Sequence, residues 1–203
     1  MRAAPRLDDE DEKNEKDGKK DSSYLLEKNL FDARTIIVSG PIDDKLCTAT
    51  VAKLLSLEDK DPEAAITIFV NSPGGSADAG FAMYDMIRFV KCPVRCVVNG
   101  LCASAAVLVF LAAPKGQRFS LPSSRFLLHQ PSTGAQGTAS DLEITAQQIV
   151  KMRERYNQIV ADAADCPAEK VLEDVNRDFW LDASEAKQYG IVDRVLNDRS
   201  EID

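Results

Sequence analysis

The sequence has little of what secreted, metal-binding or nucleic-acid-binding proteins rely on. Its 203 residues include five cysteines, an odd number that forms no C-x-x-C pair, so neither a disulfide framework nor a zinc site is indicated. Lysine and arginine number 25 against 33 aspartates and glutamates, and the net charge of −8 leaves no basic face for a phosphate backbone. We therefore expect free thiols in a reducing compartment, no metal site and no nucleic-acid partner.

Long hydrophobic runs are also missing. No segment approaches the roughly 18 apolar residues that a transmembrane helix needs, and the N-terminus has no apolar stretch of the signal-peptide kind. These absences predict a cytoplasmic protein with no membrane segment. The 44% of hydrophobic residues are nevertheless enough for the full core of one domain.

Charge patterning divides the chain into three parts. Residues 8–21, DDEDEKNEKDGKKD, are nearly all charged and cannot bury enough apolar surface to offset the entropy of ordering them. We predict a disordered, mainly acidic tail over residues 1–22, a single domain over residues 23–197 and a flexible C-terminus over residues 198–203.

Strand and helix patterns alternate through the first half of the domain. The buried-strand patterns TIIVSG, AITIFVN and PVRCVVN are each followed, after a short connection, by a helical pattern. Such alternation predicts right-handed β-α-β crossovers, and therefore an α/β fold with a mainly parallel sheet covered by helices. These sheets carry their chemistry at the carboxyl ends of the strands. The segments NSPGGS and NGLCAS, which directly follow two of the strands, are therefore the candidate site.

A long amphipathic helix is predicted in the second half of the domain. Two short β segments, QRFSLP and RFLLHQ, precede the loop PSTGAQGTAS, and apolar residues then recur at helical spacing. Ser140 and Glu143 predict a capping box at the start of this helix. The apolar stripe consists of Leu142, Ile149, Met152, Tyr156, Ile159 and Val160.

Ser104 and His129 are the candidate catalytic groups. Ser104 opens the helix after the third strand, where free backbone N–H groups favour an anion, and His129, the only histidine, ends the run RFLLH. A serine nucleophile needs an imidazole, an acceptor behind that imidazole and two oxyanion donors, which the backbone at Gly74 and Gly75 is suited to supply. Each candidate also has a structural alternative, because such serines commonly bond to the preceding turn and such histidines commonly make structural hydrogen bonds. The residues alone leave both interpretations open.

Three segments carry a resemblance to a known family. FVNSPGGSADAGFAMYDMIRF, LLHQPSTGAQGTASDLEI and NRDFWLDASEAKQYGIVDRVL resemble, in order and spacing, the signature segments of the Clp protease proteolytic subunit (ClpP) family. The resemblance covers about residues 24–197, although turns like NSPGG also occur in relatives with the crotonase fold. It implies a ClpP/crotonase-like fold of repeated β-α-β units, with a handle strand and a long helix for ring stacking.

The resemblance also implies a Ser-His-Asp triad. The serine of LCASAA matches the family nucleophile and gives Ser104, and the histidine of LLHQP matches the general base and gives His129. The family's acid falls on Asp178, with Asp174 and Asp182 as neighbouring carboxylates that could be confused with it. The order Ser, His, Asp along the chain is that of the family and differs from the orders of α/β-hydrolases and trypsin-like proteases.

Further roles follow from the same resemblance. The oxyanion donors would be the backbone N–H groups of Gly75 and Ala105. The handle spans about residues 130–164, and its small polar loop, with Gly134 and Gln136, suits an extended strand that pairs with a substrate backbone and with the opposite ring. The stripe of the long helix would serve either the subunit core or a ring contact.

The sequence departs from the family at three places. Ala105 and Ala106 stand where the family usually has Met and Gly, which predicts an altered pocket for the substrate residue before the cut. Asn176 stands where the family commonly has an acidic residue, so the inter-ring contact expected of Arg177 loses a charge-assisted bond. Residues 1–22 lack the family's apolar axial segment, which leaves the docking of an unfoldase open.

We therefore expect an ATP-dependent Clp protease proteolytic subunit, a serine endopeptidase that hydrolyses peptide bonds of unfolded polypeptides inside a double-ring chamber. The chamber would consist of stacked heptameric rings, homomeric or mixed, fed by a AAA+ unfoldase of the ClpX, ClpA or ClpC type. ATP would be used by that partner, and this chain would need no cofactor. Two alternatives remain: a ring-forming subunit with little activity outside a mixed complex with an active paralogue, and a crotonase relative that handles coenzyme A through glutamates.

Overall fold

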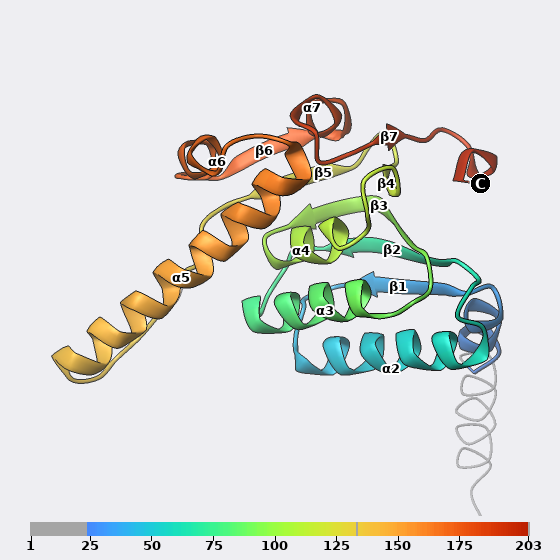
Figure 1. Ribbon diagram of the computed structural model, residues 1–203, viewed down its shortest axis with the longest axis horizontal. Helices are drawn as coiled ribbons and strands as arrows, with labels where there is room; N and C mark the ends of the chain where they lie inside the picture. Colours follow the sequence, from blue (N-terminus) through green and yellow to red (C-terminus); the bar gives the residue numbers. More distant parts are fainter. Residues whose placement is uncertain (1–23, 133, 203) are drawn as a thin grey trace, which may run out of the picture.

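Alternating strands and helices build the described part of the chain, residues 24–132 and 134–202, in the computed structural model (Figure 1). Residues 24–32 are helical and lead into the first strand. The tail predicted over residues 1–22 lies outside the described residues. The elements that follow are, in order, β1 (Thr35–Ser39), α2 (Asp44–Lys60), β2 (Ile66–Ser72), α3 (Ala77–Phe89), β3 (Val94–Ala103), α4 (Ala105–Leu111), β4 (Arg118–Ser120), β5 (Arg125–Leu128), α5 (Ala139–Ala164), α6 (Ala168–Asp174), β6 (Phe179–Asp182), α7 (Ala183–Tyr189), β7 (Arg194–Val195) and the 3-10 helix η1 (Arg199–Ile202).

The strands form one seven-stranded sheet. Its main order is β1-β2-β3-β4-β7, while β5 pairs with β3 and β6 pairs with β5. Every pair except β5 with β6 is parallel, which confirms the predicted α/β fold with a mainly parallel sheet. The first half of β3 pairs with β4 and its second half pairs with β5. Strand β3 thus has β4 beside its first half and β5 beside its second half, and this second half ends just before the candidate site.

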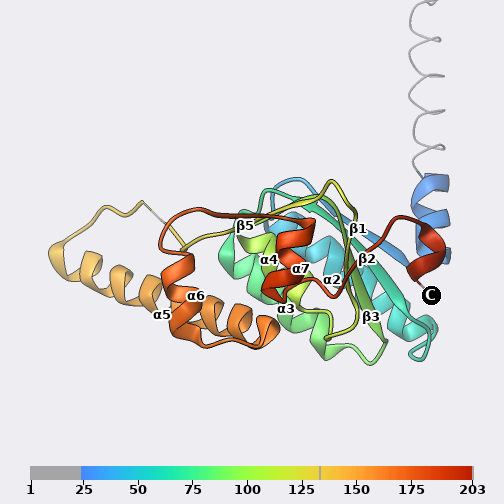
Figure 2. The ribbon, with the colours of Figure 1, turned by 90° about the horizontal axis from the view of Figure 1, so that it is seen from above.

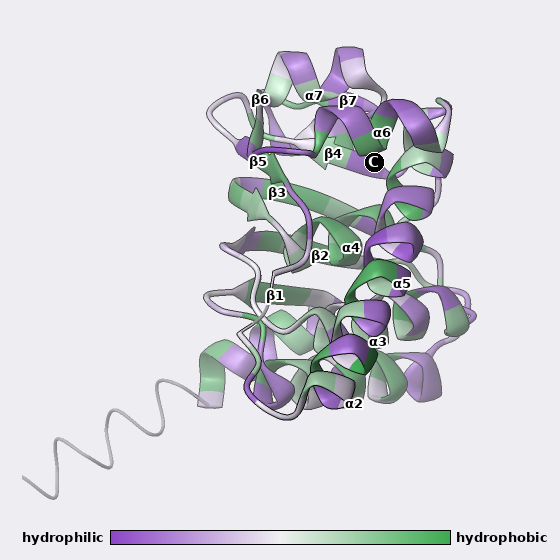
Figure 3. Ribbon diagram, turned by 90° about the vertical axis from the view of Figure 1, so that its left-hand side faces the viewer, coloured by the Kyte–Doolittle hydropathy of each residue, from purple (hydrophilic) through white to green (hydrophobic). Residues whose placement is uncertain are grey.

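Helices α2, α3 and α4 cover one face of the sheet (Figure 1). Alternate residues of β2, namely Ile66, Ile68 and Val70, are buried toward this layer. All seven residues of α4 are buried, and Figure 3 shows both β3 and α4 as largely hydrophobic. The apolar stretch that follows Ser104 is therefore a core helix, whose first turn lies at the carboxyl edge of the sheet.

The C-terminal segment covers part of the other face of the sheet. Val97 and Phe119 form a second hydrophobic cluster with Leu196, and Ile202 packs against it. Nη1 of Arg95 donates a hydrogen bond to the Ile202 carbonyl at 2.5 Å. Residues 199–202 form the helix η1 and Ile202 packs on this apolar cluster. The flexibility expected of residues 198–203 stays a prediction.

The start of α5 differs from the prediction. The N-cap is Thr138, whose side chain forms a capping box with Asp141. The box predicted at Ser140 and Glu143 is therefore wrong by two residues. Both pairs have the required spacing, and the earlier start adds two residues to the helix, which lengthens its run of backbone hydrogen bonds.

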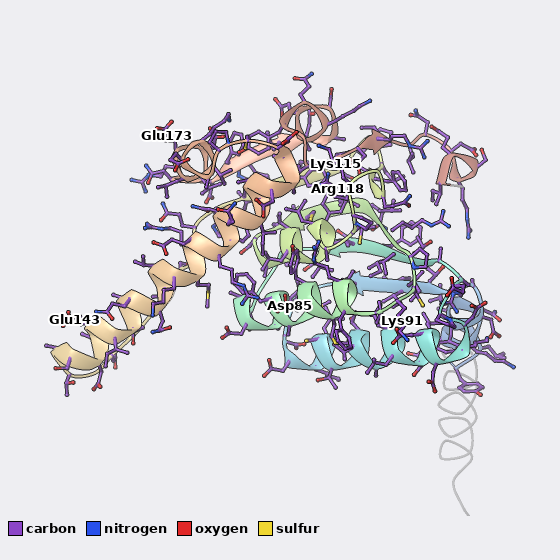
Figure 4. The ribbon with its side chains drawn as sticks, in the orientation of Figure 1. Asp85, Lys91, Lys115, Arg118, Glu143 and Glu173 are labelled. Carbon is purple, nitrogen blue, oxygen red and sulfur yellow. The ribbon has the colours of Figure 1, made fainter. Side chains whose placement is uncertain are left out.

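The first half of α5 extends away from the body. Both views show it reaching past the sheet (Figures 1 and 2), and Glu143 lies near its far end (Figure 4). Leu142, Ile144 and Val150 are exposed in this half, whereas Tyr156 in the second half is buried. The predicted apolar stripe therefore joins the core only in its second half. Neither α5 nor any other helix in the described part of the chain combines the length and hydrophobicity that a membrane span requires.

A buried ion pair ties α5 to the sheet. The Arg118 side chain on β4 is 2% exposed, and its Nη2 lies 3.3 Å from Oδ1 of Asp193. The guanidinium also donates to the Ala163 carbonyl at 3.1 Å, and Arg118 accordingly lies beneath the C-terminal elements in Figure 4. Asp193 in turn accepts a hydrogen bond from the Gly116 N–H at 2.7 Å. Strand β4, helix α5 and the segment before β7 thus share one polar centre.

Arg118→Met is expected to lower the free energy of unfolding by about 3 kcal/mol, because it leaves the largely buried Asp193 carboxylate without its cation. Urea denaturation at a fixed protein concentration measures this change. Lys115→Met is the matched control, since Lys115 and Asp165 lie 3.7 Å apart with mostly exposed side chains and should contribute little. Equal transition midpoints for the two variants would contradict a structural role for the buried pair.

Candidate active site

Ser104 occupies a sharp turn between β3 and α4. Its φ of 56° and ψ of −123° lie where residues other than glycine are rare. Its N–H donates to the Leu127 carbonyl at 2.9 Å, and its carbonyl accepts from the Val107 N–H at 3.0 Å. Ser104 is partly exposed, while Ala103 and Ala105 on either side are buried. A strained strand-to-helix turn of this kind presents its side chain to a substrate, as a nucleophile requires.

The parallel pairing of β3 with β5 brings His129 to Ser104. Ala103 pairs with Leu127, so the two strands end at the same edge of the sheet and the two candidates follow directly. Ser104 and His129 line the same cavity. Within the described residues no hydrogen bond joins their side chains, and catalytic contacts of this type are often loose until substrate binds.

The antiparallel pairing of β5 with β6 brings Asp178 to His129. Leu128 pairs with Phe179, so the residue after one strand faces the residue before the other. Nδ1 of His129 lies 3.6 Å from Oδ1 of Asp178, with side chains 30% and 64% exposed. A carboxylate at this position favours the tautomer with its proton on Nδ1, which leaves Nε2 as an acceptor.

The two neighbouring carboxylates are engaged elsewhere. Asp174 accepts a hydrogen bond from the Tyr189 hydroxyl at 2.8 Å. Asp182 caps the N-terminus of α7. Of the three candidates that the sequence offers, Asp178 is the one that lies beside His129.

A cavity of about 390 Å³ lies in front of Ser104. Residues of α5 form one wall, and residues of α3 and α4 form another. His129 also lines a second hollow, together with Asp178 and Asn176. The imidazole thus stands between the cavity that contains the serine and the hollow that contains the carboxylate.

Two backbone N–H groups on the cavity wall are free. The β-bridge between Ile42 and Gly75 uses the carbonyl before Gly75 and the N–H after it, each at 2.8 Å, so the Gly75 N–H takes no part. In the part of the chain that the structure describes, neither this N–H nor that of Ala105 has an acceptor. Both residues line the cavity with Ser104. Free donors in such a place can stabilise negative charge that develops on a substrate oxygen.

Gly74 packs directly against the turn that carries Ser104. Its φ is +86°, and a Cβ at this position would lie 2.5 Å from the Ala103 carbonyl oxygen and 2.7 Å from Cβ of Ser104. The sequence analysis expected the backbone at both Gly74 and Gly75 to be suited to supply oxyanion donors. The Gly74 N–H instead donates a hydrogen bond to Oγ of Ser72 at 3.1 Å, and Gly74 packs against the chain's own turn.

A side-chain network that the sequence analysis missed links the site to α5. Nε2 of Gln130 donates to the Asn176 carbonyl at 3.3 Å and to its side-chain oxygen at 3.2 Å. Nη1 of Arg153 donates to Oε1 of Gln130 at 3.3 Å. Because arginine only donates and a carbonyl only accepts, these partners fix the orientation of the amide. Gln130 follows His129 and Asn176 lies two residues before Asp178, so the network holds the two segments together.

The remaining predicted residues lie at the surface. Arg177 is exposed and lines the same hollow as His129 and Asp178. Gly134 and Gln136 are exposed in the segment between β5 and α5, which pairs with no strand in the described part of the chain. Their assigned roles in the handle and between rings stay predictions.

Cys102 is the cysteine nearest to Ser104 along the chain, and its thiol is buried. All five cysteines are free, and Cys102, two residues before Ser104, is fully buried. Burial raises the pKa of the Cys102 thiol well above its ordinary value. The thiol stays protonated and does not compete with Ser104 as a nucleophile.

Comparisons with known proteins lead to one group. Residues 18–199 match the family model described as Clp protease. Proteins called ATP-dependent Clp protease proteolytic subunit 3 from Rhizobium etli and Rhizobium meliloti are each 46% identical over 176 residues, which is 87% of this chain and 90% of the relative. Among solved structures, a ClpP1 mutant from Listeria monocytogenes matches with a TM-score of 0.82 and 40% identity, covering 88% of this chain and 99% of that one.

Proposed function

Because the chain belongs to the Clp protease family as a proteolytic subunit, and is therefore a serine peptidase, we propose that Ser104, His129 and Asp178 form its catalytic triad. The observation that carries the proposal is the pair of strand registers, since β3 with β5 and β5 with β6 set the three side chains around one edge of the sheet. The free N–H groups of Gly75 and Ala105 add the oxyanion donors that acyl transfer requires.

The proposed reaction follows from these positions. Oγ of Ser104 attacks the peptide carbonyl while Nε2 of His129 takes its proton, and Asp178 stabilises the resulting imidazolium. The N–H groups of Gly75 and Ala105 bind the oxyanion of the tetrahedral intermediate. His129 then gives its proton to the leaving amine, and water cleaves the acyl-enzyme by the same steps in reverse.

The proposed setting is a chamber of two stacked heptameric rings in the cytoplasm, built from this chain alone or with a paralogue. The exposed Leu142, Ile144 and Val150 on the projecting half of α5 support contacts with other subunits. Arg177, which has no ion-pair partner within the described residues, is available for a contact between rings. Unfolded polypeptides would come from a AAA+ unfoldase that hydrolyses ATP, and this chain would need no cofactor. The free thiols fit a reducing cytoplasm.

A fluorophosphonate probe tests the assigned nucleophile. We expect the purified full chain to be labelled at Ser104, as located by mass spectrometry of its peptides, and the label to be absent from Ser104→Ala. Ser132→Ala is the matched control, because Ser132 lines the same cavity and should leave labelling intact. Persistent labelling of Ser104→Ala would reject the triad.

A further inference from the structure

Two rows of residues, one on α3 and one on α5, line the cavity beside Ser104. Asp78 and Phe81 belong to the row on α3, and Gln148 and Met152 belong to the row on α5. The members of each row are three or four residues apart, so each row follows one face of its helix. The spacing between α3 and α5 therefore sets the width of the cavity at these rows.

Both rows lead to a contact that joins the two helices. Asp85 lies four residues after Phe81 on α3 (Figure 4), and Arg155 lies three residues after Met152 on α5. Nη2 of Arg155 donates a hydrogen bond to Oδ2 of Asp85 at 3.0 Å. Cζ of the same guanidinium lies over the Phe81 ring, 4.4 Å from its centroid. Arg155 on one wall thus binds a carboxylate of the other wall and also a ring that lines the cavity.

A second hollow lies between the helices beyond this contact. Its volume is about 120 Å³, and its lining includes Tyr84 and Arg88 of α3 and Ile159 and Asp162 of α5. Within residues 24–132 and 134–202, no hydrogen bond or ion pair other than that of Arg155 joins α3 to α5. The polar link between the two walls therefore sits between two hollows, where the helices are held together at a single place.

Arginine suits this place because of its shape. Its planar guanidinium can stack on an aromatic face while its edge bonds a carboxylate, whereas the ammonium of lysine has no such plane. The side chains of Arg155 and Asp85 are 54% and 61% exposed, so their ion pair adds little to the stability of the whole domain. Loss of the contact is therefore expected to change the spacing of the two walls and to leave the domain folded.

Resting on the proposed function, we propose that Arg155 is a positioning residue that holds α5 against α3 and so limits the size of the substrate side chain in the cavity. The side chain concerned belongs to the residue whose carbonyl Ser104 attacks. Without Arg155, α5 is free to move away from α3. A small substrate side chain then loses van der Waals contacts with one wall, and a large one gains room.

Two peptides that differ only in leucine or tryptophan before the cut test this role. The ratio of kcat/KM for leucine over tryptophan is expected to fall about 3- to 10-fold in Arg155→Met, the combined size of an exposed ion pair and a cation–π contact. The loss for the leucine peptide should appear in KM and not in kcat, because Arg155 touches no reacting atom. Arg155→Lys keeps the charge without the planar stack, so it should restore part of the ratio.

Lys151→Met is the matched control. It removes a cation one turn earlier on α5 that has no ion-pair partner within the described residues, so the ratio should not change. Asp85→Asn removes the other side of the ion pair and should lower the ratio in the same direction as Arg155→Met. A ratio in Arg155→Met that equals that of the unaltered chain, or that of an equally impaired Lys151→Met, would overturn the inference.

A binding measurement separates this inference from the triad. Peptide amides that end in leucine or tryptophan are titrated into Ser104→Ala, with and without Arg155→Met, and their affinities are compared. We expect Arg155→Met to lower the affinity for leucine relative to tryptophan by a similar factor. Were Ser104→Ala to cleave peptides normally, the triad would fail, yet the affinity ratio would still decide the role of Arg155. Were Ser104→Ala inactive and the affinity ratio insensitive to Arg155→Met, the positioning role of Arg155 alone would fail.

Discussion

His129→Ala is expected to lower kcat for peptide hydrolysis by about 10⁴- to 10⁶-fold. The chain has a single histidine, so no second imidazole can take the proton of Ser104. The ring also lies between the cavity of the serine and the carboxylate of Asp178, at 3.6 Å from the latter. Steady-state kinetics with a fluorogenic peptide measures the loss. KM is expected to change far less, because the imidazole would act in proton transfer during the chemical step and would contribute little to binding the substrate.

Asp178→Asn separates orientation of the imidazole from proton transfer. An amide cannot hold the same tautomer or stabilise the imidazolium, so kcat is expected to fall by up to about 10⁴-fold. Asp174→Asn is the matched control, since that carboxylate bonds Tyr189 and should leave kcat nearly unchanged. Equal losses of kcat in Asp178→Asn and Asp174→Asn would be incompatible with the role assigned to Asp178. A loss of kcat of less than tenfold in His129→Ala would be incompatible with the role assigned to His129.

Gly74→Ala is expected to lower kcat/KM by about 10²- to 10³-fold, the size of effect seen when oxyanion donors are lost. The added Cβ would come within 2.5 Å of the Ala103 carbonyl oxygen and 2.7 Å of Cβ of Ser104. Backbone atoms on both sides would have to move, which displaces Ser104 and the N–H groups of Gly75 and Ala105. The free energy of unfolding is expected to fall as well, and urea denaturation beside the kinetics reports both effects.

Gly116→Ala isolates the collision from the backbone strain. Its φ of +89° is close to the +86° of Gly74, but a Cβ at Gly116 would meet nothing within 4 Å. Both variants therefore carry the cost of a left-handed residue, about 1 to 2 kcal/mol, and only Gly74→Ala adds a clash. Equal activity in the two variants would show that contact between residue 74 and the turn at Ser104 is unimportant for activity.

Local patterns were enough to predict the first half of the fold and to single out Ser104 and His129 as candidates, although the residues alone left their roles open. Each β-α-β unit buries a short apolar run and an adjacent helical stripe, and both are visible in a single sequence. Ser104 and His129 each follow an apolar run directly, and it is the parallel pairing of β3 with β5 in the structure that brings the ends of these runs to one edge of the sheet. Asp178 could not be placed in this way. Its position depends on the antiparallel pairing of Leu128 with Phe179, and no periodicity marks a pairing between such distant segments.

Polar partnerships within the fold were also beyond the sequence. Nothing in the local sequence indicates that Arg118 is buried. Its burial and its ion pair depend on the tertiary contact between β4 and the segment before β7, which carries Asp193. Gln130 and Arg153 become partners only because α5 returns past the end of β5. Such pairs form through tertiary contacts that local propensity does not encode.

The backbone at position 104 limits which nucleophiles this fold can carry. At a φ of 56°, a side chain branched at Cβ collides with its own main chain. Threonine is therefore excluded despite its hydroxyl, whereas cysteine has the shape of serine and is tolerated. At position 104 the backbone therefore accepts a thiol in place of the primary hydroxyl of serine, but it does not accept the secondary hydroxyl of threonine.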